Sequence, residues 1–431
     1  MSGLVYSTES CFMEQKKILI PGGKASDWAL VNAAHRLGFY VITSGTDTKA
    51  PAHRYADEYV CLDYSNKEAM LSLAKEKRID YMCSCANDFG MISTAYVCEK
   101  LGLPGHDSYE TTLTIHNKDR FKPLAKRLGL HTPISEIFDN REEAIEFAKK
   151  QTKAIIIKPV DNVASIGVSK PKTKEEIPAC IDLAFSKSKI KKILIEPFCE
   201  GFFTTVTSFL IDQKVVAFFA DSAFFYKEGE VIGNEFPSNL RTTGGCQPAP
   251  YMDDWSPYII EDFNKIAREL HLSNGKFHAE LLVNPKDHSA VIFDVHRRYS
   301  GFADPWPEWD DTVSLLWEDW VLRAECGFDV SDFPVGIKQS KYFHNRNVYA
   351  PKNGHLKKVE FDTYLTAHLV SPSNVTLPGN KLVLEDIDVN DHLHQPLISV
   401  KLRFNTVKEM EYMSNPEVDE FYKHITFVYD K

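Results

Sequence analysis

Apolar strand-like runs alternate with helical stretches between residues 16 and 105, and this alternation constrains the fold more than any other feature of the chain. The strand-like runs are KKILIPGG, FYVITSGT, YVCLDY and IDYMCSCAND. The stretches DWALVNAAHRLG, NKEAMLSLAKEKR and MISTAYVCEKLG have the apolar spacing of helices. Strands that alternate with helices are typical of a parallel, doubly wound sheet. We therefore predict an α/β protein in which a loose leader, residues 1–15, precedes a Rossmann-like domain at residues 16–110.

The rest of the chain divides into two further predicted domains. Residues 111–330 begin with a helical stretch, continue with short strands and helices, and become richer in strands after Gly201. In this part GKFHAELLVN and SAVIFDVHR are joined by PKDH, which predicts a β-hairpin. From about Val335 the chain reads as short strands with Pro and Gly breaks, which predicts a β-rich C-terminal domain at residues 331–431.

Charge, hydropathy and cysteine content exclude several classes of protein. The 431 residues carry a formal net charge of -10, whereas non-specific nucleic-acid binding needs a basic surface. No apolar run approaches the roughly 18 residues of a membrane span, so we expect no membrane partner. The N-terminus lacks the pattern of a secretory signal and the nine cysteines are scattered, so we expect reduced thiols and a cytoplasmic location.

Several short motifs are too weak to assign a site. PGGKAS resembles a phosphate-binding turn but lacks the GxGxxG spacing, and a tight strand-to-helix turn explains it better. Cys83 and Cys85 lack a second pair at zinc-site spacing and are expected to be core thiols. DHLH at residues 391–394 and the glycosylation-like Asn374 are not interpreted as functional sites.

Polar residues interrupt the predicted hairpin in a pattern that indicates a site. Side chains alternate faces along a strand, so Asp294, His296 and Arg298 of VIFDVHRRYSG are expected on one face. Glu280 interrupts the paired strand, from which its carboxylate can reach the same ions as Asp294. Mg²⁺ prefers hard oxygen ligands and usually takes one or two protein carboxylates together with phosphate oxygens.

Other charged residues stand at the ends of predicted elements. Lys158 and Glu196 end the runs KAIIIKPV and ILIEPF, and Lys118 starts a helix. Lysines act as point charges on phosphates, and an arginine can bind a phosphate or carboxylate through two N–H groups. Each of these residues alone is explained as a salt bridge or a strand-end charge. Their joint pattern suits a polyphosphate bound together with Mg²⁺.

The order of these residues resembles the ATP-grasp family, in the branch that includes biotin carboxylase, carbamoyl-phosphate synthetase and the L-amino-acid ligases, over roughly residues 16–327. In that family a strand pair carries a Glu and then Glu-x-Asn-x-Arg, and here Glu280 is followed by DVHRR at residues 294–298. KPVDNVASIGV is similar to the strand-end lysine and mobile loop, ILIEPFCEG to the hinge beside adenine, and LTIHNKDRFK to the helix start with an ATP lysine. The resemblance implies that residues 111–330 form an ATP-grasp domain of two α+β subdomains, the smaller at about residues 133–196. This domain would lie in the chain between the N-terminal parallel-sheet domain and a C-terminal β-rich lid domain.

The resemblance also implies a role for each matching residue. The ATP-binding residues would be Lys118, Lys158, Ser165, Gly167, Glu196, Pro197 and Phe198. The metal ligands would be Glu280, Asp294 and His296, and the catalytic residues Arg298 and His296. The implied cofactors are ATP and Mg²⁺, with Mn²⁺ as an alternative metal.

Three residues depart from the family pattern. Asp294 replaces a Glu and is one methylene shorter. His296 stands where Asn is usual: it either binds the second metal, which favours Mn²⁺, or donates a hydrogen bond to substrate or phosphate. Phe203 stands where family members often have a Glu that holds ribose. These changes leave the fold assignment intact and bear on metal preference and ribose binding.

The function that the resemblance implies is an ATP-dependent ligation. ATP would phosphorylate a carboxylate, and a nucleophile would then displace phosphate from the acyl phosphate. YAPKNGHLKKVEF resembles part of the lid domain of amino-acid ligases, so we expect a carboxylate–amine ligase for small molecules, with a homodimer left open as its assembly. The alternatives are a bicarbonate-using carboxylase, a carbamoyl-phosphate-type enzyme and a non-catalytic nucleotide-binding homologue. Phe302, Trp306 and Trp309 fit an acceptor pocket, but core packing explains them at least as well.

Overall fold

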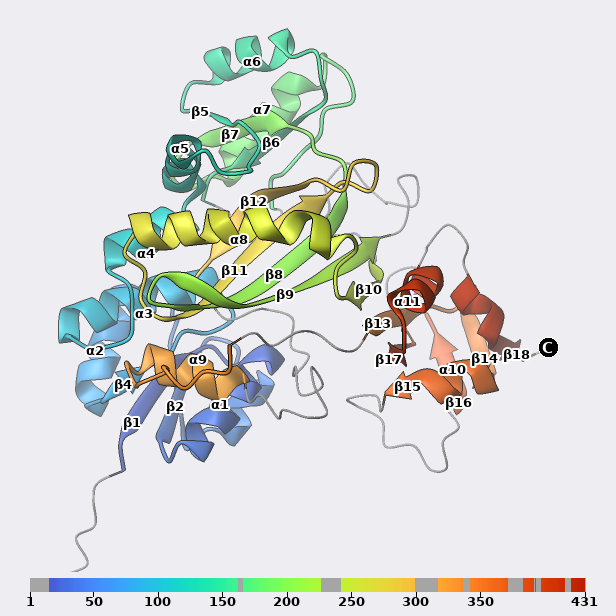
Figure 1. Cartoon of the computed structure of the whole chain (residues 1–431), viewed down its shortest axis with the longest axis horizontal. Helices are drawn as coiled ribbons and strands as arrows, with labels where there is room; N and C mark the ends of the chain where they lie inside the picture. Colours follow the sequence, from blue (N-terminus) through green and yellow to red (C-terminus); the bar gives the residue numbers. More distant parts are fainter. Residues whose placement is uncertain are drawn as a thin grey trace, which may run out of the picture. The chain divides into compact units, whose positions relative to one another are not determined.

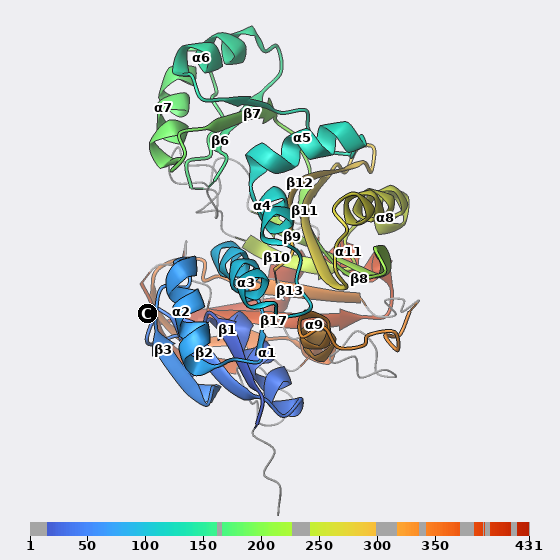
Figure 2. The same cartoon turned by 90° about the vertical axis from the view of Figure 1, so that its left-hand side faces the viewer.

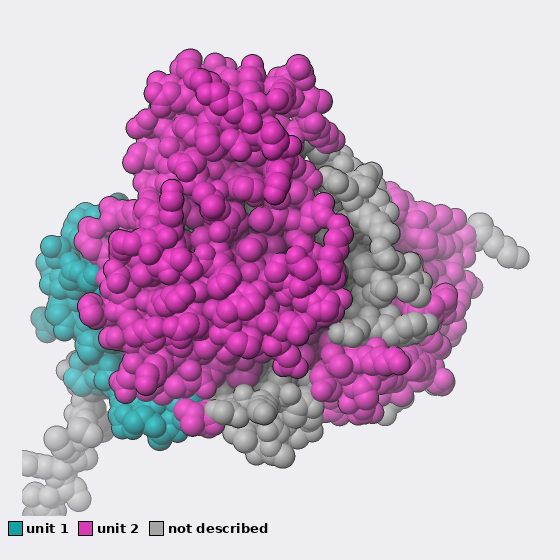
Figure 3. Space-filling view, turned by 45° about the horizontal axis from the view of Figure 1, so that its top comes forward, with its two compact units in different colours: residues 1–109, 298–306, 316–333 teal, residues 110–297, 307–315, 334–431 magenta. Residues whose placement is uncertain are grey.

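The structure is a computed structural model of the chain. It describes residues 15–161, 166–225, 242–298, 317–335, 342–370, 383–390, 392, 397–414 and 420–430. Two compact units are formed, which Figure 3 shows in different colours: unit 1 is drawn from residues 1–109, 298–306 and 316–333, and unit 2 from residues 110–297, 307–315 and 334–431. The domain bounds expected from the sequence stay a prediction.

Unit 1 contains a parallel sheet, as the alternation of strands and helices predicts. Its elements are β1 (Lys17–Pro21), α1 (Ala25–Arg36), β2 (Tyr40–Gly45), η1 (Pro51–Tyr55), β3 (Glu58–Cys61), α2 (Lys67–Lys77), β4 (Tyr81–Met82), α3 (Asp88–Leu101) and α9 (Trp317–Glu325). The strands pair in parallel in the order β3-β2-β1-β4. Because β2 and β4 lie on opposite sides of β1, the strand order reverses at β1, and sheets of this kind bind ligands beyond the carboxyl ends of the strands at such a reversal.

Helices pack on the sheet of unit 1 through apolar side chains. Met70 and Leu73 of α2 and Val97 of α3 are buried against Leu19 and Ile42 of the sheet. Helix α3 begins at Asp88 because the side chain of Asn87 accepts hydrogen bonds from the N–H groups of Phe89 and Gly90, and it ends at Gly102, which adopts the left-handed conformation. The predicted α/β fold class is confirmed.

The glycine turn after β1 is explained by local packing. Gly22 has a φ of +115°, which residues with a side chain rarely adopt. A Cβ atom on Gly23 would lie 2.1 Å from Cε1 of His53, so no larger residue fits there. Cys83 and Cys85, which follow β4, are both buried.

A small sheet with the strand order β5-β7-β6 forms the first part of unit 2. The elements of this part are α4 (Tyr109–His116), α5 (Lys118–Leu128), β5 (Glu136–Phe138), α6 (Arg141–Lys150), β6 (Ile155–Pro159), α7 (Ile177–Lys187) and β7 (Ile193–Pro197). The β-branched residues Ile155, Ile157 and Ile195 are buried against Ala144 of α6 and Ile181 of α7. Both helices lie beside this sheet in Figures 1 and 2.

A large sheet forms the centre of unit 2, with the strand order β12-β11-β8-β9-β10-β13-β17-β15. The elements not yet named are β8 (Phe202–Ile211), β9 (Lys214–Phe225), β10 (Thr242–Gln247), α8 (Met252–Glu269), β11 (Gly275–Val283), β12 (Ala290–His296), β13 (Tyr342–Val348), β15 (Leu369–Val370) and β17 (Ile398–Phe404). Helix α8 lies across one face of this sheet (Figure 1), where Trp255 and Phe263 are buried with Phe277 of β11. Phe121 and Leu124 of α5 belong to the same core.

The C-terminal part of unit 2 adds a further antiparallel sheet with the strand order β16-β14-β18. Its elements are β14 (Gly354–Phe361), α10 (Thr363–His368), β16 (Val383–Val389), α11 (Val407–Ser414), η3 (Glu420–His424) and β18 (Ile425–Tyr429). Leu356, Leu402, Met410 and Phe421 are buried in one core that joins this sheet to the end of the large sheet. Among the residues that the structure describes, none of the helices is both long and apolar enough to span a membrane.

Candidate active site

The paired strands β11 and β12 carry the three residues that the resemblance assigns to metal binding. Glu280 lies directly opposite Asp294 in the antiparallel register, and His278 lies opposite His296. Glu280, Asp294 and His296 each offer one ligand atom, and these three atoms lie within 4.8 Å of one another. Two carboxylate oxygens and an imidazole nitrogen at this spacing are a donor set suited to a divalent cation. The hairpin thus brings together the side chains that the sequence places at a metal site.

The register of the hairpin shifts next to these carboxylates. Glu280 pairs with Asp294 but Leu281 pairs with Ile292, so Phe293 is an extra residue in β12. Bulges of this kind are common beside active sites because they re-aim the neighbouring side chains. The ring of Phe293 packs against that of Phe203, with 5.7 Å between the ring centroids. Phe203, which stands where family members often have a ribose-binding Glu, is therefore part of an aromatic pair.

Lys118 is the first residue of α5, as the sequence predicts, and it contacts the proposed metal site directly. Its Nζ lies 2.6 Å from Oδ2 of Asp294, and the two side chains are only 13% and 15% exposed. Burial by itself would raise the pKa of Asp294, but the charges of Lys118 and His296 and the hydrogen bond from Lys118 outweigh it, and the pKa lies well below its usual range. Asp294 is therefore a carboxylate at neutral pH, paired with a lysine.

Glu196, in β7, is the centre of a second group of buried charges. Its Oε1 lies 2.6 Å from Nζ of Lys158 and its Oε2 lies 3.2 Å from Nζ of Lys122. The hydroxyl of Ser135 donates a hydrogen bond of 2.8 Å to the same Oε2. Burial opposes ionisation of Glu196, but the charges of Lys158 and Lys122 prevail and lower its pKa to about 2. Burial favours the neutral form of Lys122 as well and therefore lowers its pKa, although the charge of Glu196 acts in the opposite direction.

The proposed adenine hinge follows Glu196 directly. Pro197 is the last residue of β7. The backbone N–H of Phe198 donates a hydrogen bond of 2.8 Å to the carbonyl of Ala154, so this amide is bound within the small sheet. Nζ of Lys170 lies 3.6 Å from the centroid of the Phe198 ring, a cation–π contact.

The glycine loop predicted to close over phosphate is described only in part. Ser165 lies outside the described residues, as do Phe302, Trp306, Trp309 and Asn374. Gly167 is described and has a φ of +79°. A Cβ atom at this position would lie 2.8 Å from Cβ of Lys187, so both the backbone conformation and the packing require a glycine.

Arg298 stands beyond the strand that was expected to carry it. Strand β12 ends at His296, so the alternation of side chains that applies to Asp294 and His296 does not extend to Arg298. Within unit 1, Nε of Arg298 donates a hydrogen bond of 2.9 Å to Oδ1 of Asp88, the first residue of α3. The role of Arg298 at the site stays a prediction.

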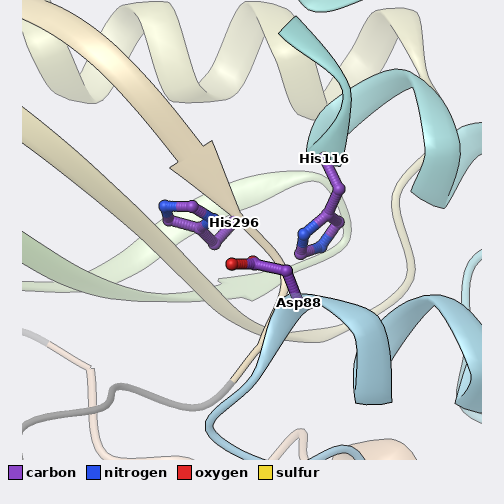
Figure 4. A group of neighbouring side chains, drawn as sticks. All are labelled: Asp88, His116 and His296. Carbon is purple, nitrogen blue, oxygen red and sulfur yellow. The ribbon is translucent and has the colours of Figure 1, made fainter. Parts of the chain in front are cut away.

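Sequence reasoning missed two histidines and a lysine in these clusters. His116 ends α4, its Nε2 accepts a hydrogen bond of 3.2 Å from the backbone N–H of Arg297, and its ring lies beside that of His296, 5.8 Å between centroids (Figure 4). The ring of His278 lies 5.7 Å from that of His296. Lys122, the third missed residue, follows Lys118 by four positions, which places both on one face of a helix. This four-residue spacing is a signal that the sequence contains. So is the two-residue spacing of His278 from Glu280, which places both side chains on one face of a strand.

Comparisons with known proteins extend over most of the chain. No protein-family model matches it. The formate-dependent phosphoribosylglycinamide formyltransferase of Wolinella succinogenes is 21% identical over 363 residues, which cover 81% of this chain and 87% of that protein. The crystal structure of the L-amino acid ligase from Bacillus licheniformis matches with a TM-score of 0.69 at 16% identity, covering 97% of this chain and 99% of that one.

A third comparison adds a structure with a bound nucleotide. The biotin carboxylase domain dimer of 2-oxoglutarate carboxylase from Hydrogenobacter thermophilus, solved with MgADP, ADP and bicarbonate, matches with a TM-score of 0.66 at 14% identity. The match covers 96% of this chain and 91% of that one. At these identities the structural likenesses show the fold, and they confirm the fold that the sequence resemblance predicts.

Proposed function

Because the chain has the ATP-grasp fold, we propose that it is an ATP-dependent carboxylate–amine ligase that joins two small molecules through an amide or peptide bond and releases ADP and phosphate. The observation that carries this proposal is the clustering of Glu280, Asp294 and His296 on paired strands, with Lys118 bound to Asp294. The likeness to an L-amino acid ligase supports a carboxylate and an amine as the substrates. A homodimer is the proposed assembly, since the Hydrogenobacter neighbour is a dimer.

The donor set fits a divalent cation bound with a nucleotide. Glu280 and Asp294 would supply carboxylate oxygens to Mg²⁺, and the nitrogen of His296 would also suit Mn²⁺. When bound, the metal neutralises charge on the phosphate oxygens. Lys118 and Lys158 are the proposed phosphate ligands.

The adenine site is proposed for the hinge at the end of the small sheet. Glu196, Pro197 and Phe198 follow one another there, and the lysine contacts of Glu196 fix its carboxylate. Ser165 and Gly167 are proposed to cover the phosphates. The required glycine at residue 167 supports a tight loop at this point.

The proposed reaction has two steps that balance in atoms and charge. A carboxylate oxygen of the first substrate attacks the γ-phosphorus, and the bond to ADP breaks. The amine nitrogen of the second substrate then attacks the acyl carbon, phosphate leaves, and the nitrogen loses a proton. Positioning and charge neutralisation suffice for this chemistry, and the described lysines provide both. Arg298 would hold the transferred phosphoryl group, and His296 would either bind metal or donate a hydrogen bond to substrate or phosphate.

A screen of ADP release tests the proposed function. Amino acids and sugar acids are paired with amines in the presence of ATP and Mg²⁺, and bicarbonate is included as a separate substrate. We expect sustained, catalytic release of ADP only when a carboxylate and an amine are both present, because the amine is needed to discharge the acyl phosphate formed in the first step. Asp294→Asn is expected to abolish ADP formation while the protein stays folded, because it removes a charged metal ligand. Asp254→Asn, which changes an exposed carboxylate paired with His288, is the matched control and should keep full activity.

Two outcomes would contradict the proposal. ADP release with bicarbonate alone would assign the chain to the carboxylases or the carbamoyl-phosphate-type enzymes. Nucleotide binding without ADP release from any pair would indicate a non-catalytic homologue.

A further inference from the structure

We infer that Lys118 takes the place of the metal ion at Asp294 until a nucleotide binds, so that metal and nucleotide bind cooperatively and each is weakly held without the other. The inference rests on the proposed function and concerns how its site is regulated. It gives Lys118 two partners in succession, the carboxylate of Asp294 first and the phosphates of the nucleotide afterwards.

The contact between the two side chains is close and sheltered from water. Nζ of Lys118 lies 2.6 Å from Oδ2 of Asp294, and both side chains are largely buried. Lys118 is held at the start of α5, where its backbone N–H donates a hydrogen bond of 3.4 Å to the carbonyl of Val160. The pKa of Asp294 is lowered, against the effect of burial, chiefly by the charge of Lys118. The ammonium group therefore stabilises the carboxylate in the way a bound cation would.

The same arrangement holds at the other proposed nucleotide residues. Glu196 is bound by Lys158 at 2.6 Å and by Lys122 at 3.2 Å. Lys118 and Lys158, the two lysines proposed to bind phosphate, thus both have a carboxylate partner, and the carboxylate of Asp294 has a cation as its partner. Binding of a metal–nucleotide complex is then an exchange of partners, in which lysines pass to phosphates and Asp294 passes to the metal.

An exchange of this kind makes the two ligands depend on each other. A divalent cation alone has to compete with the ammonium of Lys118 for the same carboxylate, and the two cations repel each other. A nucleotide alone would draw Lys118 away and leave the carboxylate of Asp294 buried without its cation, which is costly. When both ligands arrive, every charge has a partner. Because coupling between two ligands is reciprocal, the metal must raise nucleotide affinity by the factor by which the nucleotide raises metal affinity.

Metal titration without nucleotide tests the inference directly. Mn²⁺ is titrated into the wild-type protein and into Lys118→Met, and free Mn²⁺ is followed by electron paramagnetic resonance. We expect Lys118→Met to bind Mn²⁺ about tenfold more tightly than the wild type, because the competing ammonium group is gone. A tenfold change is a typical size for coupling between two sites. The loss of a proposed nucleotide ligand does not affect this titration, which contains no nucleotide. Lys118→Arg keeps the positive charge and should bind Mn²⁺ as weakly as the wild type. Lys192→Met should behave as the wild type, because it removes a half-buried lysine that lies outside α5 and pairs with Asp119 of α5.

A second measurement uses ADP as the probe, with the wild-type protein and Lys118→Met. ADP affinity, measured by calorimetry, should rise about tenfold in saturating Mn²⁺, and this rise should largely disappear in Lys118→Met. Equal Mn²⁺ affinities of the wild type and Lys118→Met, or an ADP affinity that Mn²⁺ leaves unchanged, would overturn the inference.

The outcomes also separate this inference from the proposed function. If Asp294→Asn binds Mn²⁺ as well as the wild type does in the presence of ADP, the proposed metal site itself is wrong, and the inference fails with it. If only Lys118→Met fails to gain affinity, the metal site stands and the exchange is wrong.

Discussion

Glu196 is ionised inside the protein because two lysines surround it. The carboxyl group is almost fully buried, and burial alone would favour its neutral form. Lys158 and Lys122 reverse that preference, and the pKa falls from an ordinary 4.5 to about 2. A group whose pKa is lower in the folded than in the unfolded protein adds stability above its unfolded pKa. That contribution is lost as the pH falls through the folded pKa.

The acid stability of the protein should therefore depend on Glu196. At pH 7 we expect Glu196→Gln to lower the free energy of unfolding by about 3–5 kcal/mol, because it leaves two buried lysines without their carboxylate. Between pH 4.5 and pH 2 the wild type should lose stability more steeply than the variant. The difference in unfolding free energy between the two proteins should therefore become smaller as the pH falls. Urea unfolding followed by circular dichroism at a series of pH values measures both effects. The control is Glu200→Gln, which removes an exposed carboxylate paired with Lys286, and an unchanged pH dependence in Glu196→Gln would contradict the assignment.

A second prediction for a single residue concerns His296 and the preferred metal. One nitrogen of this buried imidazole lies within 4.8 Å of oxygens of Glu280 and Asp294, and nitrogen ligands suit Mn²⁺ better than Mg²⁺. We expect His296→Asn to keep metal-dependent ADP binding and to shift the preference from Mn²⁺ towards Mg²⁺. Calorimetric titration of ADP in each metal measures the shift. If metal preference is unchanged and the apparent affinity for the substrate changes instead, His296 is a hydrogen-bond donor and not a ligand.

At the scale of elements, periodicity identified most strands and helices but not how they end or shift. The hairpin of β11 and β12 follows from two apolar runs joined by PKDH. The sequence predicted Glu280 and Asp294 on its adjacent strands, and the structure adds that the two residues lie directly opposite each other. The extra residue at Phe293 could not be predicted, because a bulge depends on how the strand packs against its neighbours rather than on its own pattern. Strand β12 also ends at His296, so Arg298 lies beyond the strand.

Helix α5 shows what the pattern contained and what only the structure adds. The start of the helix at Lys118 and the shared face of Lys118 and Lys122 follow from the sequence. That Lys118 meets Asp294 in the large sheet, whereas Lys122 meets Glu196 in the small sheet, requires the tertiary arrangement. Pairing of charges between distant elements leaves no mark on local periodicity, so the partners of the lysines were beyond sequence reasoning.

At the scale of the whole molecule, the sequence predicted the class of fold. The motifs around Lys158, Glu196, Glu280 and Asp294 were sufficient for this because their order along the chain is itself informative. The grouping of α9 with the N-terminal sheet was not foreseen. A helical pattern shows that a helix forms, and it does not show which core buries its apolar face.

Unit 1 is discontinuous in sequence, because α9 returns to the N-terminal sheet after about 200 residues of unit 2. Oε2 of Glu325, at the end of α9, accepts a hydrogen bond of 2.6 Å from the backbone N–H of Ser84, and Oε1 accepts one of 2.9 Å from its hydroxyl. Nε of Arg36, in α1, donates a hydrogen bond of 3.0 Å to Oδ1 of Asp319. Without α9, the buried N–H of Ser84 and the apolar surface of α1 would lose their partners.

We therefore expect residues 15–109 alone to be unfolded or only partly folded, and the same residues joined to residues 317–335 by a flexible linker to fold. The reason is that α9 buries Trp317, Val321 and Leu322 and supplies the carboxylate of Glu325. The cooperativity of urea unfolding and the dispersion of amide resonances measure the difference. In the joined form, Glu325→Gln should lower the free energy of unfolding by about 1–3 kcal/mol. The carboxylate of Glu325 accepts two hydrogen bonds from Ser84 through its two oxygens, whereas the amide of Gln has only one oxygen to accept them. Cooperative unfolding of residues 15–109 alone, at the same urea midpoint as the joined form, would show that α9 is not needed for this unit to fold.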